Sequence, residues 1–281
     1  MAGVLVLSFD ALLIRLALAD AWTVLFWRGL FIGLSLSLVL YAGSASFLPR
    51  EIKRQGPAAV ASGILFGLSS TGFVFSVVHT HVANTVLVFS TAPIFAALFT
   101  RFILRERMRR GTWPAIGAVI AGVAVVFQGS LAAGNLAGDL MALFAAVMVG
   151  ANFTLLRRHP RIKRTPVVAL GGFIAAGLAF FWASPLSLEM QSYLVLALMG
   201  LVQMPLASML LAVSTRSLSS PEVSLILLLE AILGPLWVWL VLKETPPSAT
   251  LVGGVIIILT LALYFLPFLH RDHHARPGHR A

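Results

Sequence analysis

The sequence predicts an all-α integral membrane protein with ten transmembrane helices in two inverted five-helix repeats. Three observations predict this class. Of the 281 residues, 59% are hydrophobic and only 11% are charged, whereas about a quarter of the residues of a soluble domain are charged. The apolar residues fall into runs near the ~20 residues that cross a bilayer as a helix. Basic residues gather in alternate connections, and the second half of the chain repeats features of the first.

Ten apolar segments are separated by short stretches that contain turn and breaker residues, such as Pro49, Gly56, Gly134 and Pro185. Because these connections are short, we expect each helix to run antiparallel to the one before it. The predicted helices are Gly3–Ala19, Trp22–Tyr41, Pro57–Val78, Val82–Ile103, Thr112–Gln128, Leu136–Leu156, Pro166–Ala183, Gln191–Ser214, Ser220–Leu242 and Ser248–Phe268.

The basic residues predict the orientation of the chain. Most of the 20 Lys and Arg residues follow the second, fourth, sixth and eighth predicted helices or lie in the tail, whereas the opposite connections carry only Lys243. Lys and Arg are enriched in cytoplasmic connections. We therefore expect a multi-pass protein of the cell (inner) membrane with both termini cytoplasmic. The first apolar run lacks a basic start and a small-residue cleavage site, so no cleavable signal peptide is expected.

Composition and motifs exclude other classes. The net charge of +10 does not indicate nucleic-acid binding, because the basic residues lie in the short connections between apolar segments, as is typical of a membrane protein. Without cysteine the chain has no disulfide or cysteine metal site. It has no His-Glu-x-x-His, no phosphate-binding glycine loop with a lysine and no Gly-x-Ser-x-Gly sequence. We expect no enzyme, catalytic residue, cofactor or metal site; the expected partners are a small-molecule substrate and the lipid bilayer.

The chain also repeats internally. A shift of about 138 residues places Val82–Phe127 over Ser220–Phe265 and matches Glu106 with Glu244. Each half has an odd number of predicted helices, so the halves have opposite orientations, as in many secondary transporters. We predict two five-helix repeats, residues 1–133 and 134–269, followed by a basic cytoplasmic tail, residues 270–281.

Two segments carry a family resemblance. Ser90–Glu106 reads STAPIFAALFTRFILRE, and Leu229–Glu244 reads LEAILGPLWVWLVLKE. With the ten helices and the repeat, they resemble the EamA-like branch of the drug/metabolite transporter superfamily over essentially the whole chain. Ala231 occupies the position where the second segment is expected to have proline, and Pro235 follows one turn later, which predicts a displaced kink.

The resemblance implies a central cavity lined by helices 1–4 and 6–9, with helices 5 and 10 peripheral. It also implies a secondary active transporter that works by alternating access and exports amino acids or related metabolites. The alternatives are a proton-coupled multidrug exporter and a metabolite importer. Whether protons are coupled stays open.

Glu230 is the first candidate site residue. It lies near the middle of the predicted helix Ser220–Leu242, where an ionised carboxylate costs at least ~3 kcal/mol. A transporter can keep such a group to bind a cationic solute or a proton. The alternative is a buried acid that is hydrogen-bonded or kept neutral.

Asp10 and Arg28 form the second candidate group. Their distances from the turn Ala19–Ala21 differ by about three residues, or ~5 Å of helix rise, and an arginine side chain spans that gap. The pair holds helices 1 and 2 together, or Arg28 receives a substrate carboxylate while Asp10 orients it or exchanges protons.

The remaining candidates are uncharged residues within predicted helices. For each polar candidate, the alternative to substrate binding is a hydrogen bond between helices. For the tryptophan, the alternative is packing in the core or against lipid. Prolines expose a backbone carbonyl and can act as hinges or as plain packing kinks. A small-residue stripe around Gly117 and Gly122 predicts an intrachain contact or a homodimer seam. The predicted substrate-binding residues are Gln203, Asn84, Thr91 and Trp27, and the predicted hinge residues are Pro93, Gly234 and Pro235.

Overall fold

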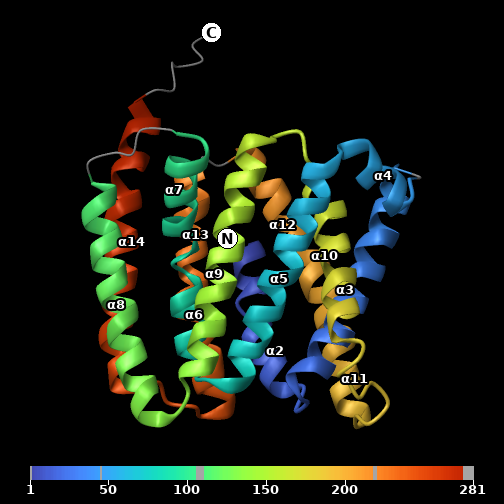
Figure 1. Cartoon of the computed structure of the whole chain (residues 1–281), viewed down its shortest axis with the longest axis horizontal. Coiled ribbons are helices and arrows are strands. Elements are labelled where there is room, and N and C mark those ends of the chain that lie inside the picture. The colour runs from blue at the N-terminus through green and yellow to red at the C-terminus, as the bar shows by residue number, and fades with distance from the viewer. Residues whose placement is uncertain (1, 45, 106–110, 218–219, 275–281) are drawn as a thin grey trace.

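The computed structural model describes residues 2–44, 46–105, 111–217 and 220–274, and these form helices joined by short connections (Figure 1). The helices are α1 (Ala2–Leu7), α2 (Asp10–Leu16), α3 (Ala21–Ser44), α4 (Leu48–Gln55), α5 (Pro57–His79), α6 (Val82–Phe89), α7 (Ala92–Ile103), α8 (Thr112–Ala133), α9 (Leu136–Arg158), α10 (Arg164–Ala179), α11 (Met190–Ala197), the π-helix η1 (Leu198–Gln203), α12 (Met204–Ser217), α13 (Ser220–Leu242) and α14 (Ser248–His274).

Six helical segments of the described chain are long and apolar enough to cross a membrane, and shorter apolar helices accompany them. The all-α membrane class is therefore confirmed. The long segments are Ala21–Gly43, Pro57–His79, Val82–Ile103, Thr112–Ala133, Leu136–Arg158 and Met190–Leu210, and the shorter ones are Arg164–Ala179, Leu228–Leu242 and Ser248–Tyr264.

Several predicted helices differ in their continuity. The first is two helices, α1 and α2, with a turn at Ser8–Phe9, and the eighth contains the π-helix η1. The fourth is broken at Ser90–Thr91, and Pro93 falls in the first turn of α7, where a missing N–H costs nothing. At the predicted hinge residues Gly234 and Pro235 the ninth helix is not interrupted, because α13 runs through both residues.

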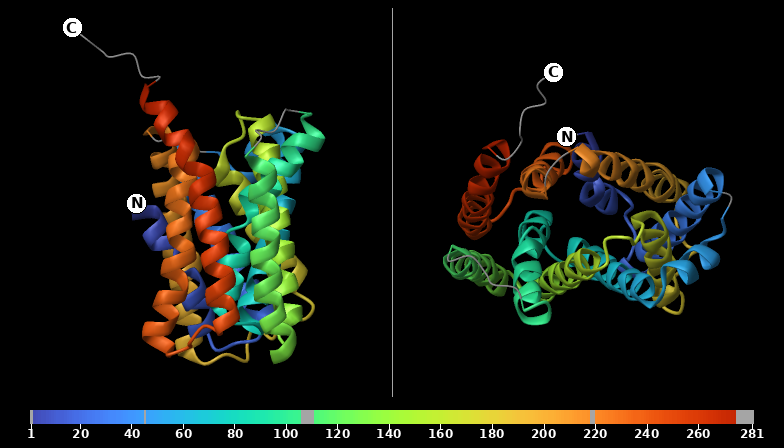
Figure 2. Two further views of the ribbon diagram at one scale, coloured as in Figure 1. Left: turned by 90° about the vertical axis from the view of Figure 1, so that its left-hand side faces the viewer. Right: turned by 90° about the horizontal axis from the view of Figure 1, so that it is seen from above.

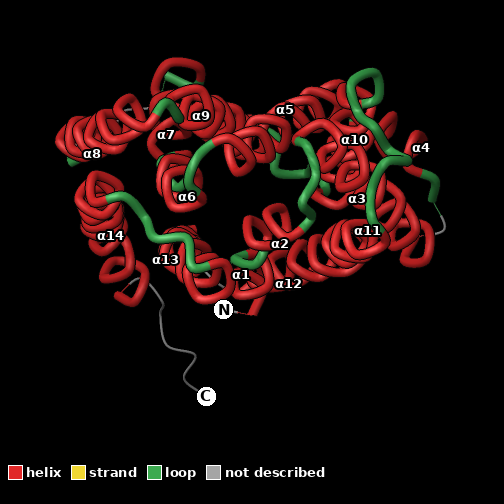
Figure 3. The backbone as a smooth tube through the Cα atoms, turned by 90° about the horizontal axis from the view of Figure 1, so that it is seen from below, coloured by secondary structure: helices red, strands yellow, loops and turns green. Residues whose placement is uncertain are grey.

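The helices form a closed ring (Figure 3). Each helix of the ring contacts the next one, in the order α8, α9, α5, α10, α3, α12, α1, α13 and α14. The ring closes because α14 also contacts α8. The helices α8 and α14, which correspond to the predicted fifth and tenth helices, pack together at one end of the ring (Figures 2 and 3). α2 lies inside the ring and contacts α5 on one side and α13 on the other.

Glycines bring neighbouring backbones together at two seams. A Cβ on Gly29 would lie 2.6 Å from the carbonyl oxygen of Gly172, which joins α3 to α10. A Cβ on Gly253 would lie 2.6 Å from the carbonyl oxygen of Gly122, which joins α14 to α8. The small-residue stripe is therefore an intrachain contact at Gly122, whereas Gly117 faces open space. Such close approach is typical of membrane helices, which associate mainly by packing.

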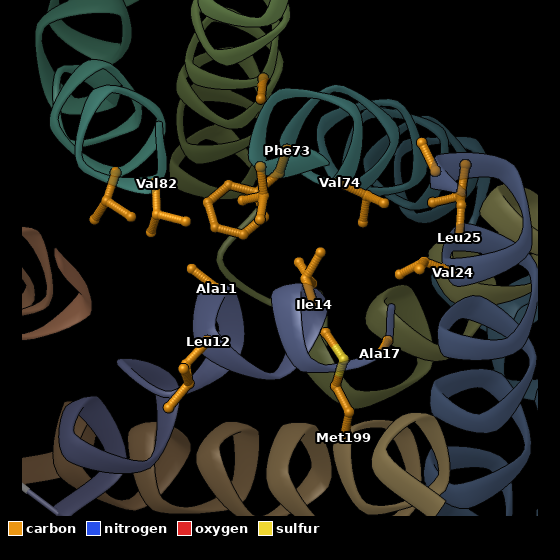
Figure 4. Close-up of a cluster of buried hydrophobic side chains, with 14 of the residues drawn as sticks. Ala11, Leu12, Ile14, Ala17, Val24, Leu25, Phe73, Val74, Val82 and Met199 are labelled. Atoms are coloured by element: carbon orange, nitrogen blue, oxygen red, sulfur yellow. The ribbon is translucent and has the colours of Figure 1, made fainter. Parts of the chain in front are cut away.

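The main hydrophobic core surrounds α2 (Figure 4). Ile14 of α2 is 1% exposed and lies among residues of α3, α5 and η1, including Leu25, Val74 and Met199. This packing holds α2 within the ring and fixes the position of its first residue, Asp10.

Candidate functional site

The break between α1 and α2 is held by side chains from two other helices. The Ser8 hydroxyl donates to the carbonyl of Leu5 (2.8 Å), and such bonds to the preceding turn bend a helix. Gln203 Nε2 donates to the carbonyl of Val6 (3.0 Å). Trp237 Nε1 donates to the Ser8 hydroxyl (2.9 Å). Helices η1 and α13 thus bind the chain at the break, one from each side.

Asp10 begins α2 and forms a buried ion pair with Arg28 of α3. Arg28 Nη2 lies 2.8 Å from Asp10 Oδ2, and Arg28 Nη1 donates to the hydroxyl of Ser70 in α5. The two charged residues are 4% and 2% exposed. A buried ion pair offsets its desolvation cost only when its remaining polar atoms are satisfied. The structure therefore brings together the two side chains that the sequence placed at similar depth.

Three buried polar atoms around this pair lack a hydrogen-bond partner among the described residues: Asp10 Oδ1, Arg28 Nε and Gln203 Oε1. Buried polar atoms are nearly always paired in folded proteins, so each exception requires an explanation. Together they supply one donor and two acceptors that the described protein groups leave unused.

Glu230 lies on the face of α13 that is turned toward the broken helix. Gly234, one turn later, approaches Val86 of α6, and Trp237, two turns later, binds Ser8. Residues spaced by four and seven share a helix face. Glu230 is partly exposed and close enough to Asp10 for the two carboxylates to repel each other. The site thus combines two carboxylates with one guanidinium.

The other predicted residues have partners elsewhere. The Thr91 hydroxyl, at the break between α6 and α7, donates to the carbonyl of Val88 in the last turn of α6 (2.6 Å). Trp27 Nε1 donates to the carbonyl of Pro185 (3.0 Å), and its ring packs on Phe31 and Tyr193. These described contacts tie Trp27 to α11 and to the connection before it, away from the Asp10 group.

Asn84 belongs to a separate buried network with Asp139, a residue that was not among the predicted site residues. Asn84 Nδ2 donates to Ser130 Oγ (2.7 Å) and to Asp139 Oδ1 (3.2 Å). Thr80 donates to Asp139 Oδ1 (2.7 Å), and Thr250 donates to Asn84 Oδ1. These residues join α6, α8, α9 and α14. Asp139 is completely buried, although it lies in the first turn of α9, where an acid usually reaches water, so its sequence position carried no signal of its burial.

A polar cluster joins the two halves of the chain at the end opposite α4. Glu244, after α13, accepts from the backbone N–H of Val82 (3.0 Å), lies 3.2 Å from His81 Nδ1 and lies 3.5 Å from Arg15. Arg15 also donates to the carbonyl of Thr80 (2.7 Å). One carboxylate therefore connects α2, the start of α6 and the connection before α14.

The described geometry combines a helix ring, a broken helix inside it and a charged group at the break. Consistent with this, the model of the EamA-like transporter family matches residues 1–128 and 136–266. The chain belongs to the EamA-like transporter family. It is therefore a membrane transporter of the drug/metabolite superfamily rather than an enzyme, as the two sequence segments indicated. Glu106, the repeat counterpart of Glu244, lies outside the described residues.

Relatives of this EamA-like transporter include an exporter of a metabolite. The pseudopaline exporter CntI of Pseudomonas aeruginosa, from strains UCBPP-PA14 and PAO1, is 23% identical over 220 residues, covering 74% of this chain and 75% of the relative. A solved crystal structure of another protein aligns with a TM-score of 0.65 and 19% identity over 96% of both chains. That likeness shows a shared fold.

Proposed function

We propose that this transporter is a secondary active carrier that exports amino acids or related amine-bearing metabolites by alternating access. Family membership supports transport of a small molecule across a membrane. The relative named for pseudopaline export supports a metabolite as cargo and export as the direction. The substrate class is inferred from the charges at the α1–α2 break.

We also propose the membrane arrangement. The ten predicted helices cross the membrane in two inverted repeats, residues 1–133 and 134–269, around a central solute path, with both termini and the tail cytoplasmic. Two family matches in one chain support the repeat, and the basic connections support the orientation. In inverted-repeat transporters the solute site lies at the repeat interface, near the middle of the bilayer and at broken helices. The break between α1 and α2 fits that description.

The observation that carries the proposal is the buried Asp10–Arg28 pair, with unused polar atoms, beside Glu230. An amino acid presents an ammonium group and a carboxylate. Its carboxylate fits the free Arg28 Nε, and its ammonium group fits between Asp10 and Glu230. Gln203 Oε1 supplies a further acceptor at the break.

Glu230 also gives the site a means of proton coupling. Asp10 and Arg28 cancel each other's charge, so an ionised Glu230 leaves the group with a net negative charge. Away from water that charge is costly, and either the ammonium group of a solute placed beside Glu230 or a proton on Glu230 lowers the cost. Binding of one then competes with binding of the other, which is the basis of exchange across a proton gradient. Among the remaining predicted residues, Asn84 and Trp27 hold helices together. Thr91 bonds the turn before it, and the break before Pro93 lets α6 and α7 move separately.

Reconstituted counterflow tests the proposal. Vesicles with the purified protein, loaded with unlabelled amino acids, should accumulate labelled amino acids transiently above the outside concentration. A channel would equilibrate the label without this overshoot, and a scaffold would leave it outside. Comparison of intracellular and extracellular metabolites between deletion and overexpression strains then identifies the cargo. Identical pools in both strains would argue against export.

A further inference from the structure

The short helix α4 has two chemically different faces. Arg50, Lys53 and Arg54 follow the i, i+3, i+4 spacing that aligns side chains on one face of a helix, and all three are exposed. Ile52 on the opposite face is buried, and so is Glu51, which lies three residues before Arg54 and borders the basic face. The sequence predicts a connection here, whereas the structure shows an amphipathic helix at the end of the bundle that carries the basic connections (Figure 1).

A fourth cation joins this face from a distant part of the chain. Lys163, just before α10, places Nζ 3.0 Å from Glu51 Oε1, and its backbone N–H donates to the side-chain carbonyl of Gln55 (2.8 Å). Arg54 lies 4.0 Å from the same carboxylate. Lys163 and Arg54 side chains stay 60% and 79% exposed, whereas that of Glu51 is 3% exposed. The anion is thus beneath the surface and the cations are on it.

The position of α4 along the membrane normal follows from the chain itself. The apolar span of α3 ends at Gly43, and α4 begins at Leu48. Five residue steps reach at most ~17 Å, so α4 starts within or close beside the headgroup layer. Phe47 is 68% exposed and lies against Tyr41, with ring centroids 5.1 Å apart. Exposed aromatic residues of this kind are typical of the membrane interface.

We propose that the basic face of α4, together with Lys163, binds the headgroups of anionic phospholipids. The α4 region carries four cations and one buried carboxylate, Glu51, which pairs with Lys163 and Arg54, so the surface keeps an excess of positive charge at the depth of the lipid phosphates. Basic residues on an amphipathic helix recognise anionic headgroups by this combination of depth and charge. The proposal concerns the periphery of the ring and is independent of the solute that the transporter carries.

The test measures binding of phosphatidylglycerol and phosphatidylcholine to the full-length protein in neutral detergent by native mass spectrometry. The variant Arg50→Gln/Lys53→Gln removes two exposed charges from α4. The matched control Arg101→Gln/Arg105→Gln removes two exposed charges, one from the last turn of α7 and one from just beyond its end. Each basic residue near an anionic surface changes affinity about fivefold, so two should change it about 30-fold.

The expected result is that the unaltered protein prefers phosphatidylglycerol and that the α4 variant loses about 30-fold in affinity for it. The control pair should stay within about twofold of the unaltered protein. Size-exclusion profiles and unfolding midpoints identify any misfolded variant, and Arg50→Gln alone, expected to lose about fivefold, replaces the pair if the pair fails to fold. Equal losses in both pairs, or equal binding of the two lipids, would overturn the proposal. Displacement by inorganic phosphate at lipid-like concentrations would also overturn it.

Discussion

Replacing Glu230 with glutamine isolates the charge of the candidate site. The substitution keeps the side chain's size and its ability to accept hydrogen bonds. Because Asp10 and Arg28 form an ion pair, Glu230 supplies the net charge of the group, and the variant makes the group neutral. A hydrogen bond to a charged group contributes about 1.5–3 kcal/mol. Binding of an amine-bearing solute should therefore weaken about 10- to 150-fold.

Two assays in vesicles separate binding from coupling. At saturating solute, counterflow by Glu230→Gln should continue, since exchange of solute for solute needs no proton. Uphill transport driven by a pH gradient should disappear, because glutamine does not titrate. Glu189→Gln is the matched control: Glu189 is exposed at the start of α11, and this variant should behave like the unaltered protein in both assays.

The two outcomes that matter are distinct. If counterflow and pH-driven transport fall together, Glu230 shapes the site without coupling protons. If pH-driven transport in Glu230→Gln equals that of the Glu189→Gln control, Glu230 has no part in the mechanism. Asp10 is then the next candidate, since it is the other acid beside the broken helix.

Three further predictions follow from the remaining charged contacts. Asp10→Asn strands its buried guanidinium partner and should lower the unfolding free energy in detergent by ~3–5 kcal/mol, as breaking a buried ion pair does; an unchanged denaturation midpoint would contradict this. Lys163 hydrogen-bonds Glu51 and lowers its pKa, so Glu51 stabilises the fold above the ordinary glutamate pKa and loses that effect as pH falls through the lowered value. The Glu51→Gln variant should therefore have a lower unfolding free energy than the unaltered protein at neutral pH and an equal one in acid. A difference between the two proteins that stays constant across pH would refute the argument. Glu244→Gln removes the carboxylate that joins both halves, so the end of the ring that it holds together should open more readily. A cysteine introduced at Ser8 of this cysteine-free chain should then react faster with an impermeant thiol reagent added outside. An unchanged reaction rate would count against a gating role for Glu244.

The sequence predicted the helical segments better than their continuity. Hydropathy identifies a span because every residue in it contributes to the transfer free energy, whereas a break depends on a few local contacts. The turn at Ser8–Phe9 contains neither glycine nor proline. It is held by Gln203 and Trp237, which lie far away in the sequence. No local pattern could reveal these two partners.

The two candidate hinge prolines show the same limit. Pro93 follows Ser90 and Thr91, whose hydroxyls bond the carbonyls of the preceding turn, and the helix breaks there. Pro235 lies in a helix that continues past it. A proline removes one donor in both cases, so its presence alone does not decide whether a membrane helix breaks.

The acidic residues show what depth along a helix can and cannot reveal. Glu230 was selected because it lies mid-helix in an apolar segment, and the structure places it beside the broken helix and Asp10. Asp139 lies in the first turn of its helix, where an acid is expected to reach water, yet it is fully buried beneath Thr80 and Asn84. The difference arises because the segment that contains Thr80 and Asn84 covers that end of the helix and supplies neutral hydrogen-bond donors. A carboxylate with donors only from neutral groups fits a helix-joining role, whereas one beside an incompletely paired arginine fits a solute site. Partner chemistry, which appears only in the fold, therefore separates the two acids where sequence position does not.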